Sequence, residues 1–199
     1  KPVMWSPVEQ TALAEAEVEY ADRKATTVWV KFPVARAFIE RGQEDLAHQF
    51  SKASVVIWTT TPWTIPANRA VSFNPDISYG LYECESLEQG LAFEPWIKPG
   101  DKLVVADKLA ESVMKAAKAG GWKRLCDMGA AVLHNMTLRH PLGYLGYTFN
   151  VPMLAGSHVS GDTGTGFVHT APSQGEDDYE VWMANVKRPE GEGIDTSIP

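Results

Sequence analysis

The chain has 199 residues, of which 44% are hydrophobic and 22% are charged, and its formal net charge is −7. These values are typical of one globular domain with a core of its own. No apolar run approaches the roughly 20 residues of a membrane-spanning helix. The acidic balance argues against a large phosphate-binding surface, because such surfaces are normally basic. Membrane residence and extensive nucleic-acid contact are therefore not expected.

The two cysteines indicate the cellular compartment, and the first residues indicate whether the chain is part of a longer protein. Only Cys84 and Cys126 are present, which is typical of a reducing compartment, so we expect both to be reduced in a cytoplasmic protein. Lys1-Pro2-Val3 shows neither an initiator Met nor a signal-peptide pattern, and we interpret the chain as an excised part of a longer protein. No spacing of Cys and His suits zinc, so no metal is expected.

The N-terminal quarter predicts two strands. Glu15 to Tyr20 alternates acidic and apolar residues, as in a strand with one solvated face, and Thr26 to Phe32 predicts the returning strand. Phe38 to Phe50 is polar, with Leu46 and Phe50 four residues apart, which leaves a helix and an ordered loop both open.

A buried strand followed by hydroxyl side chains stands out next. Val55 to Trp58 is a continuous run of β-branched and aromatic residues, which suits a strand covered on both faces. Thr59 to Thr61 follow it, and Pro62 and Pro66 each remove a backbone donor and stop strand and helix alike. The threonines are either ordinary strand residues or the lining of a stiff loop.

Further strands are expected along the rest of the chain. After a turn at Phe73 to Asp76, the predicted strands are Ile77–Cys84, Lys102–Ala106, Val132–Leu138 and Val151–Leu154. Glu85 to Gly100 is expected to be a surface excursion, and Pro141 to Asn150 a glycine-rich loop.

Helices are fewer. Asp107 is a suitable N-cap for a helix over Lys108–Ala119, which Gly120-Gly121 would end. Near the C-terminus, a Gly164-Thr165-Gly166 turn leads into a short strand, and a helix is expected from Glu176 to about Val186. Strands outnumber helices without a βαβ rhythm. The sequence therefore predicts a mostly β (α+β) domain, an antiparallel barrel or curled sheet with peripheral helices.

Two stretches together carry a family resemblance. Thr59-Thr60-Thr61-Pro62 and His169-Thr170-Ala171-Pro172 resemble the two halves of the editing pocket in the connective peptide 1 insertion of isoleucyl-tRNA synthetases, which are class I aminoacyl-tRNA synthetases. Related valyl and leucyl enzymes carry Thr-Thr-Arg-Pro at the first stretch and lack the second. The resemblance extends to Trp5-Ser6-Pro7 and to Thr11–Tyr20. It does not cover about Phe38 to Lys52 and Leu87 to Lys98.

The resemblance implies a single barrel-like editing domain over residues 1–199, excised from a larger synthetase. Its expected activity is hydrolysis of the ester in valyl-tRNA(Ile). Its expected partners are the 3′ end of that tRNA, the valine moiety and the rest of the synthetase. The alternative is a module that docks the acceptor end without cleaving it. The zinc-binding Cys-x-x-Cys of the family is replaced by Ser6 and Glu9, so neither metal nor other cofactor is expected.

The resemblance also assigns roles to single residues. Thr59, Thr60, Thr61, Asn68 and Asp178 are expected to be catalytic, and Trp63, His169 and Asp178 to bind the substrate. Uncharged hydroxyls and amides can donate to an oxyanion and position water. Trp63 is expected to pack beside the threonines.

Two further residues have both a functional and a structural interpretation. Asp177 and Asp178 would complement the dipole of a helix start in any protein, but the resemblance implies that Asp178 pairs with the α-ammonium group of the substrate. His169 could be a core histidine with satisfied hydrogen bonds. By resemblance it is instead the wall that admits valine and excludes the larger isoleucine side chain.

Overall fold

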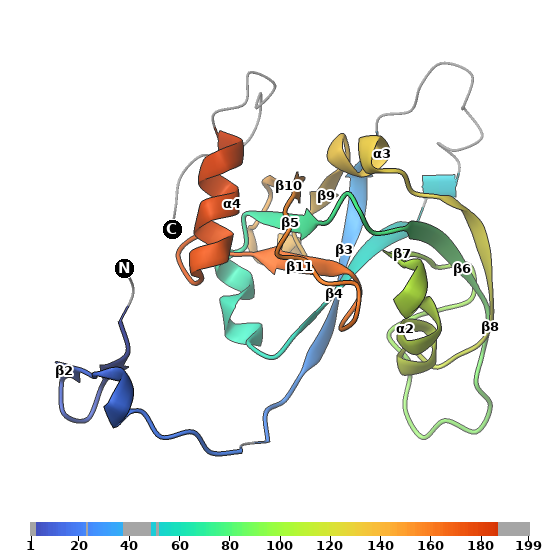
Figure 1. Cartoon of the computed structure of the whole chain (residues 1–199). Helices are drawn as coiled ribbons and strands as arrows, with labels where there is room; N and C mark the ends of the chain where they lie inside the picture. Colours follow the sequence, from blue (N-terminus) through green and yellow to red (C-terminus); the bar gives the residue numbers. More distant parts are fainter. Residues whose placement is uncertain (1–2, 23, 38–48, 51, 187–199) are drawn as a thin grey trace.

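A computed structural model describes residues 3–22, 24–37, 49–50 and 52–186 (Figure 1). Its main feature is a nine-stranded mixed sheet, and the prediction of a mostly β domain is confirmed. In spatial order the strands are β11 (Phe167–Thr170), β5 (Ala70–Phe73), β10 (Asn150–Ala155), β9 (Thr137–Arg139), β3 (Val28–Arg36), β4 (Ala53–Thr59), β7 (Lys102–Ala106), β6 (Tyr79–Leu87) and β8 (Ala119–Asp127).

The sheet is open, so the expected barrel is too strict a description. Neighbouring strands are antiparallel except for the parallel pairs β5–β10 and β4–β7. In the described part of the chain, β11 and β8 are the two edges of the sheet. The sheet nevertheless curls, because β11 packs against β4 although the strands β5, β10, β9 and β3 lie between them in the sheet order. A separate hairpin pairs β1 (Trp5–Ser6) with β2 (Thr11–Ala12).

Short helices lie around the sheet (Figure 1). The α-helices are α2 (Ala110–Ala116), α3 (Ala130–His134) and α4 (Glu176–Val186). The 3₁₀ helices are η1 (Glu15–Glu17), η2 (Pro62–Ala67), η3 (Asp107–Leu109) and η4 (Gly143–Leu145). None of the helices in the described residues is long and apolar enough to cross a membrane.

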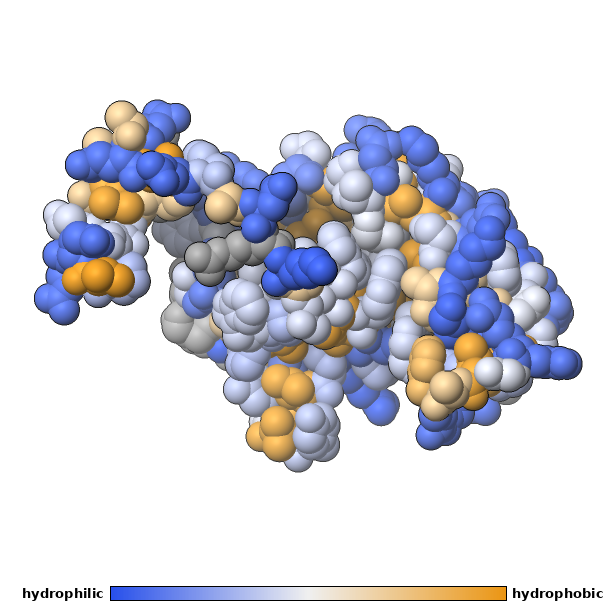
Figure 2. All heavy atoms as spheres, turned by 90° about the horizontal axis from the view of Figure 1, so that it is seen from below, coloured by the Kyte–Doolittle hydropathy of each residue, from blue (hydrophilic) through white to orange (hydrophobic). Residues whose placement is uncertain are grey.

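The hydrophobic core surrounds β4. Val55, Val56 and Ile57 are fully buried although their side chains alternate between the faces of the sheet, which confirms the prediction of a strand covered on both sides for these three residues. Trp58, the last residue of the predicted run, is exposed and lines a cavity. Figure 2 shows that hydrophobic side chains form only small, separate areas on the face seen from below. Large apolar side chains that stay exposed, such as Trp5, Trp63 and Tyr144, lie outside the core.

A glycine turn holds the curled edge of the sheet in place. Gly166 has φ +79°, and a Cβ atom there would lie 2.4 Å from the Cβ of Ala106, so only glycine fits. The Tyr79 hydroxyl donates to the carbonyl of Gly166 at 2.8 Å, and the backbone N–H of Ala106 donates to the carbonyl of Thr165 at 2.9 Å. These contacts fix the turn before β11 against the end of β7 and the start of β6.

Several strand and helix predictions are confirmed with shifted ends. The strands expected at Thr26–Phe32, Ile77–Cys84 and Val151–Leu154 are β3, β6 and β10, and the one at Lys102–Ala106 is β7 with the same bounds. The helix expected from Glu176 is α4. The prediction over Phe38–Phe50 falls almost wholly outside the described residues.

Two predicted strands are wrong. Glu15–Glu17 form the short helix η1, because the Glu17 carboxylate accepts the backbone N–H of Ala14 at 2.7 Å and closes a local turn, and Val18 to Tyr20 form neither helix nor strand. The segment expected to be one strand at Val132–Leu138 divides into α3 and β9. Val132, Leu133 and His134 continue a short helix that begins at Ala130 and Ala131, which are good helix formers, and only the end of the segment pairs as a strand.

The Lys108–Ala119 helix is shorter than predicted, and Asp107 is not its N-cap. The Asp107 carboxylate accepts hydrogen bonds from Arg124 Nε at 3.0 Å and from Tyr82 Oη at 2.6 Å. The helix ends at Ala116, and Gly120 belongs to the unpredicted strand β8. A Cβ at Gly120 would lie 2.7 Å from the carbonyl oxygen of Leu87, so this glycine permits close strand pairing.

Candidate active site

A cavity of about 380 Å³ opens where β4 ends. It lies between the 3₁₀ helix η2, the edge strand β11 and the first turn of α4. The lining residues are Trp58, Thr59, Thr61, Trp63, Thr64, Val168, His169, Ala171, Gln174 and Asp178. Both sequence stretches that carried the resemblance therefore meet in one place.

The expected stiff loop after β4 is the 3₁₀ helix η2. Pro62 takes the first helical position, where its fixed φ is suitable, and Pro66 costs only one donor in a segment this short. The backbone N–H of Thr61 donates to Thr59 Oγ1 at 3.1 Å, and the hydroxyl of Thr64 donates to the carbonyl of Thr61 at 2.8 Å. Three threonine side chains are thus fixed at the cavity.

The hydrogen bonds of His169 define its tautomer. Its Nδ1 lies 3.3 Å from the amide nitrogen of Asn68, which can only donate, so Nδ1 accepts. Its Nε2 lies 2.8 Å from Thr64 Oγ1. Because the Thr64 hydroxyl proton is directed at the carbonyl of Thr61, Nε2 carries the proton that Thr64 accepts. Both ring nitrogens are occupied, which suits a fixed wall better than a general base.

Burial keeps this imidazole neutral. Desolvation, assisted by the nearby His140, lowers the pKa of His169 to about 4. Its exposed fraction is only 9%, yet the side chain lines the cavity. His169 therefore has the satisfied hydrogen bonds of a core histidine and also a surface that a ligand would meet.

Asp178 contributes a carboxylate to the lining of the same cavity. It lies in the first turn of α4, and its Oδ2 accepts the backbone N–H of Ala171 at 2.9 Å. Burial raises the pKa of Asp178, against the opposing effects of the Ala171 hydrogen bond and His158. No salt bridge to Asp178 forms among the described residues. A cationic ligand would relieve this desolvated carboxylate.

Most of the expected site residues meet at the cavity, and two do not line it. Thr59, Thr61, Trp63, His169 and Asp178 are lining residues, and the Trp63 side chain is exposed. Thr60 is exposed just outside the lining.

Asn68 is the other residue that does not line the cavity. It is fully buried behind His169, where its amide nitrogen also donates to the carbonyl of Ala70 at 2.7 Å. Its position suits orienting His169 better than positioning a water molecule.

Two polar lining residues were not predicted. Thr64 contacts His169, and the three-residue period of η2 places it on the same side as Thr61. Recognising Pro62–Ala67 as a 3₁₀ helix would have identified it. Gln174 lies in the turn before α4, and no pattern in the sequence marks it.

At the N-terminal hairpin, the Ser6 hydroxyl hydrogen-bonds the carboxylate of Glu9. No group of three or more potential metal-ligating side chains occurs among the residues that the structure describes. The absence of a metal remains a prediction.

The neutral state of His169 predicts a pH-dependent stability. Since the unfolded histidine titrates near 6.5 and the folded one near 4, the unfolded state binds the proton first as pH falls. The contribution of neutral His169 to the free energy of unfolding is therefore complete above pH 6.5 and decreases as the pH falls from 6.5 to 4. From pH 7 to pH 5 we expect the free energy of unfolding to fall about 2 kcal/mol more in the parent than in His169→Gln.

Urea unfolding at both pH values measures this difference. His140 and Asp178 are common to both proteins, so their own titrations largely cancel in the comparison. Equal losses in parent and variant would show that His169 is not desolvated.

Comparison with known structures identifies the class of fold. The Plasmodium falciparum cytosolic leucyl-tRNA synthetase editing domain aligns with a TM-score of 0.56 at 14% identity, over 79% of this chain and 65% of that chain. The Plasmodium knowlesi domain gives a TM-score of 0.56 at 12% identity, over 81% and 62%. The fold is therefore that of a synthetase editing domain of the connective peptide 1 type.

Sequence comparison identifies the kind of synthetase to which the chain is related. Isoleucine--tRNA ligase of Caulobacter vibrioides is 58% identical over 190 residues, covering 94% of this chain and 18% of the ligase. The ligase of Rhodopseudomonas palustris is 52% identical over 100% of this chain and 19% of its own length. No family model matches. The chain is homologous along its length to one segment of isoleucine--tRNA ligases and spans about a fifth of them, which confirms the resemblance.

Proposed function

We propose that residues 1–199 form a single editing domain that hydrolyses the ester of valyl-tRNA(Ile) and excludes isoleucine by size. The observation that carries this proposal is the cavity that joins three threonine hydroxyls, a fixed neutral histidine and an unpaired carboxylate. The homology to isoleucine--tRNA ligases supports the choice of tRNA, and the editing-domain fold supports the choice of reaction.

Asp178 would bind the α-ammonium group of the aminoacyl ester. A partly buried, desolvated carboxylate gains from pairing with a cation that neutralises it, and this pairing would hold the ester in one orientation. The aminoacyl ester is already reactive because its ammonium group withdraws electrons. The domain then needs mainly to position the ester and an attacking water.

The threonine hydroxyls would donate hydrogen bonds to the carbonyl oxygen of the ester. Thr59 and Thr61 hydroxyls lie 3.2 Å apart, so one can donate to the other while the second donates into the cavity. Such donors stabilise the negative charge that develops on the carbonyl oxygen, and they carry no charge at rest. A cavity of about 380 Å³ is within the usual range for small-molecule sites.

The 3′ end of tRNA(Ile) would reach this cavity while the remainder of a cytoplasmic synthetase holds the body of the tRNA. This division of labour agrees with the net charge of −7, which favours few phosphate contacts. The alternative function is a module that docks acceptor ends without hydrolysis.

Release of labelled amino acid distinguishes the two functions. The parent chain is expected to release valine from valyl-tRNA(Ile) and to spare isoleucyl-tRNA(Ile). Thr61→Val removes a lining hydroxyl at nearly constant volume, so we expect kcat to fall at least tenfold with KM little changed. Thr60→Val is the matched control, and its rate should stay within about twofold of the parent rate.

A chain that binds the tRNA without releasing valine would support the docking module. If Thr60→Val and Thr61→Val behave alike, the cavity lining does not determine the rate.

A further inference from the structure

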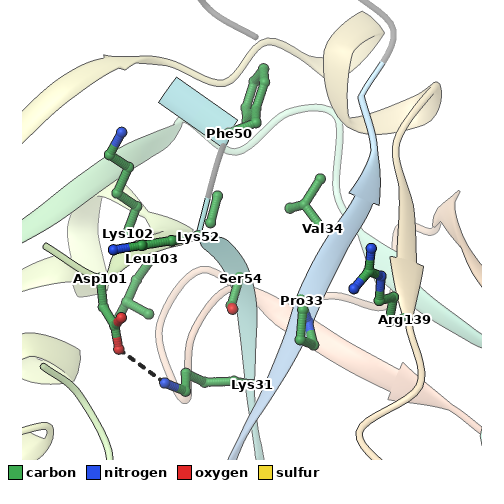
Figure 3. Close-up of a pocket in the computed structure, with 11 residues that line it drawn as sticks. Lys31, Pro33, Val34, Phe50, Lys52, Ser54, Asp101, Lys102, Leu103 and Arg139 are labelled. Atoms are coloured by element: carbon green, nitrogen blue, oxygen red, sulfur yellow. Dashed lines mark hydrogen bonds and ion pairs between the residues drawn. The ribbon is translucent and has the colours of Figure 1, made fainter. Parts of the chain in front are cut away.

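A second pocket, of about 460 Å³, lies on the strands β9, β3, β4 and β7, which are neighbours in the sheet (Figure 3). Its charged lining residues are Lys31, Lys52, Lys102, Arg139 and Asp101. Four cations and one anion therefore converge in a chain whose overall charge is −7. The second pocket shares no lining residue with the cavity at Asp178.

Three of the four cations lack an acidic partner within the described residues. Lys31 Nζ pairs with Asp101 Oδ2 at 3.1 Å. Lys52, Lys102 and Arg139 form no salt bridge with any described carboxylate. Clustered like charges repel each other, and a bound anion would relieve the repulsion.

The backbone fixes where these cations lie. The N–H of Lys102 donates to the carbonyl of Lys52 at 3.3 Å, which joins the start of β7 to the entry of β4. Figure 3 shows Lys52 and Lys102 on one side of the pocket and Arg139 on the other, with Ser54 and Pro33 between them. An anion in the pocket would therefore meet positive charge from two sides.

The spread of charge favours a phosphodiester chain over a free polyphosphate. Compact phosphate sites are usually made by a glycine-rich loop whose N–H groups converge, whereas here long cationic side chains are distributed over several strands. The spacing to the cavity is also suitable. Ser54 and Trp58 leave the same face of β4 and are four residues, or about 13 Å, apart.

We propose that this second pocket binds backbone phosphates of the tRNA whose 3′ end enters the Asp178 cavity. The identity of the RNA rests on the proposed function, while the phosphate chemistry rests on the pocket itself. The contact is small, which is compatible with an acidic domain that uses few phosphate contacts.

Binding of uncharged tRNA(Ile) to the chain tests the proposal without requiring hydrolysis. The test variant is Lys52→Gln/Lys102→Gln/Arg139→Gln. The control is Lys98→Gln/Lys108→Gln/Lys115→Gln, which removes the same total charge from exposed lysines that pair with Glu94, Asp162 and Glu111. Circular dichroism establishes that both variants are folded.

For the test variant we expect Kd to rise about tenfold or more at low salt, and the slope of log K against log salt to become shallower by about 2. The control should change neither quantity by a comparable amount. In the deacylation assay the test variant should raise KM and leave kcat unchanged.

Equal binding by the test and control variants would overturn the proposal. It would also be overturned if pyrophosphate bound the parent through these three residues while tRNA binding did not depend on them. Weaker tRNA binding by the test variant in a chain that releases no valine would support the phosphate site and contradict the editing activity. If the parent releases valine but the test variant binds tRNA as tightly as the parent, the editing activity is supported and the phosphate site is contradicted.

Discussion

Replacing Asp178 by asparagine is expected to lower deacylation of valyl-tRNA(Ile) by about 10²- to 10³-fold. Removing one member of a desolvated charge pair typically costs about 2–5 kcal/mol, because the remaining charge is left without a partner. Asparagine retains an oxygen that can accept the backbone N–H of Ala171, so the turn before α4 is preserved. The measurement is the rate of valine release per active chain, with folding checked by circular dichroism.

Asp177 provides the matched control for this prediction. It is the neighbouring carboxylate in the first turn of α4, it is exposed, and it does not line the cavity. Asp177→Asn should therefore deacylate at nearly the parent rate. If Asp178→Asn were folded and as active as Asp177→Asn, Asp178 would be only a helix-start residue and would bind no ammonium group.

His169→Ala is expected to make the domain hydrolyse isoleucyl-tRNA(Ile) while it still hydrolyses valyl-tRNA(Ile). Truncation of this buried wall enlarges the cavity where the extra methyl carbon of isoleucine would otherwise collide. One methylene is worth about 1–3 kcal/mol in a hydrophobic pocket, or about 10- to 200-fold, a general range for which the synthetic site of isoleucyl-tRNA synthetases is itself the usual example. Release of labelled isoleucine measures the change.

A variant of similar volume separates size from hydrogen bonding. His169→Gln fills most of the same space and should continue to spare isoleucine, although it alters the contacts to Thr64 and Asn68. A folded His169→Ala that clears valine and spares isoleucine would place the discrimination elsewhere in the lining. Trp63 and Thr64 would then be the next residues to test.

The individual elements were predictable where the local signal and the tertiary environment agreed. The β-branched run from Val55 is apolar enough to require burial on both faces, and it became the centre of the sheet. Glu176–Val186 begins with acidic residues that favour a helix start, and it forms α4. The strand predicted at Glu15–Tyr20 is wrong because no strand in the described part of the chain pairs with it, and a side-chain hydrogen bond closes a turn instead.

Five of the residues that line the candidate cavity could be predicted from the sequence alone. Thr59 to Thr61, His169 and Asp178 are recognisable in order along the chain, and homology then fixed the relatives to which they belong. What each residue touches depends on the curl of the sheet. This curl packs β11 against β4, and the Gly166 turn before β11 contacts Ala106 of β7 and Tyr79 of β6.

Only the tertiary structure decided where each of these residues lies relative to the cavity. It placed Asn68 behind His169, brought in Thr64 and left Thr60 outside the lining. It also gathered Lys52, Lys102 and Arg139 from separate segments into one basic pocket that no local pattern marks. The physical reason is that side-chain burial and charge proximity depend on which strands become neighbours, and long-range pairing is not encoded in any single stretch.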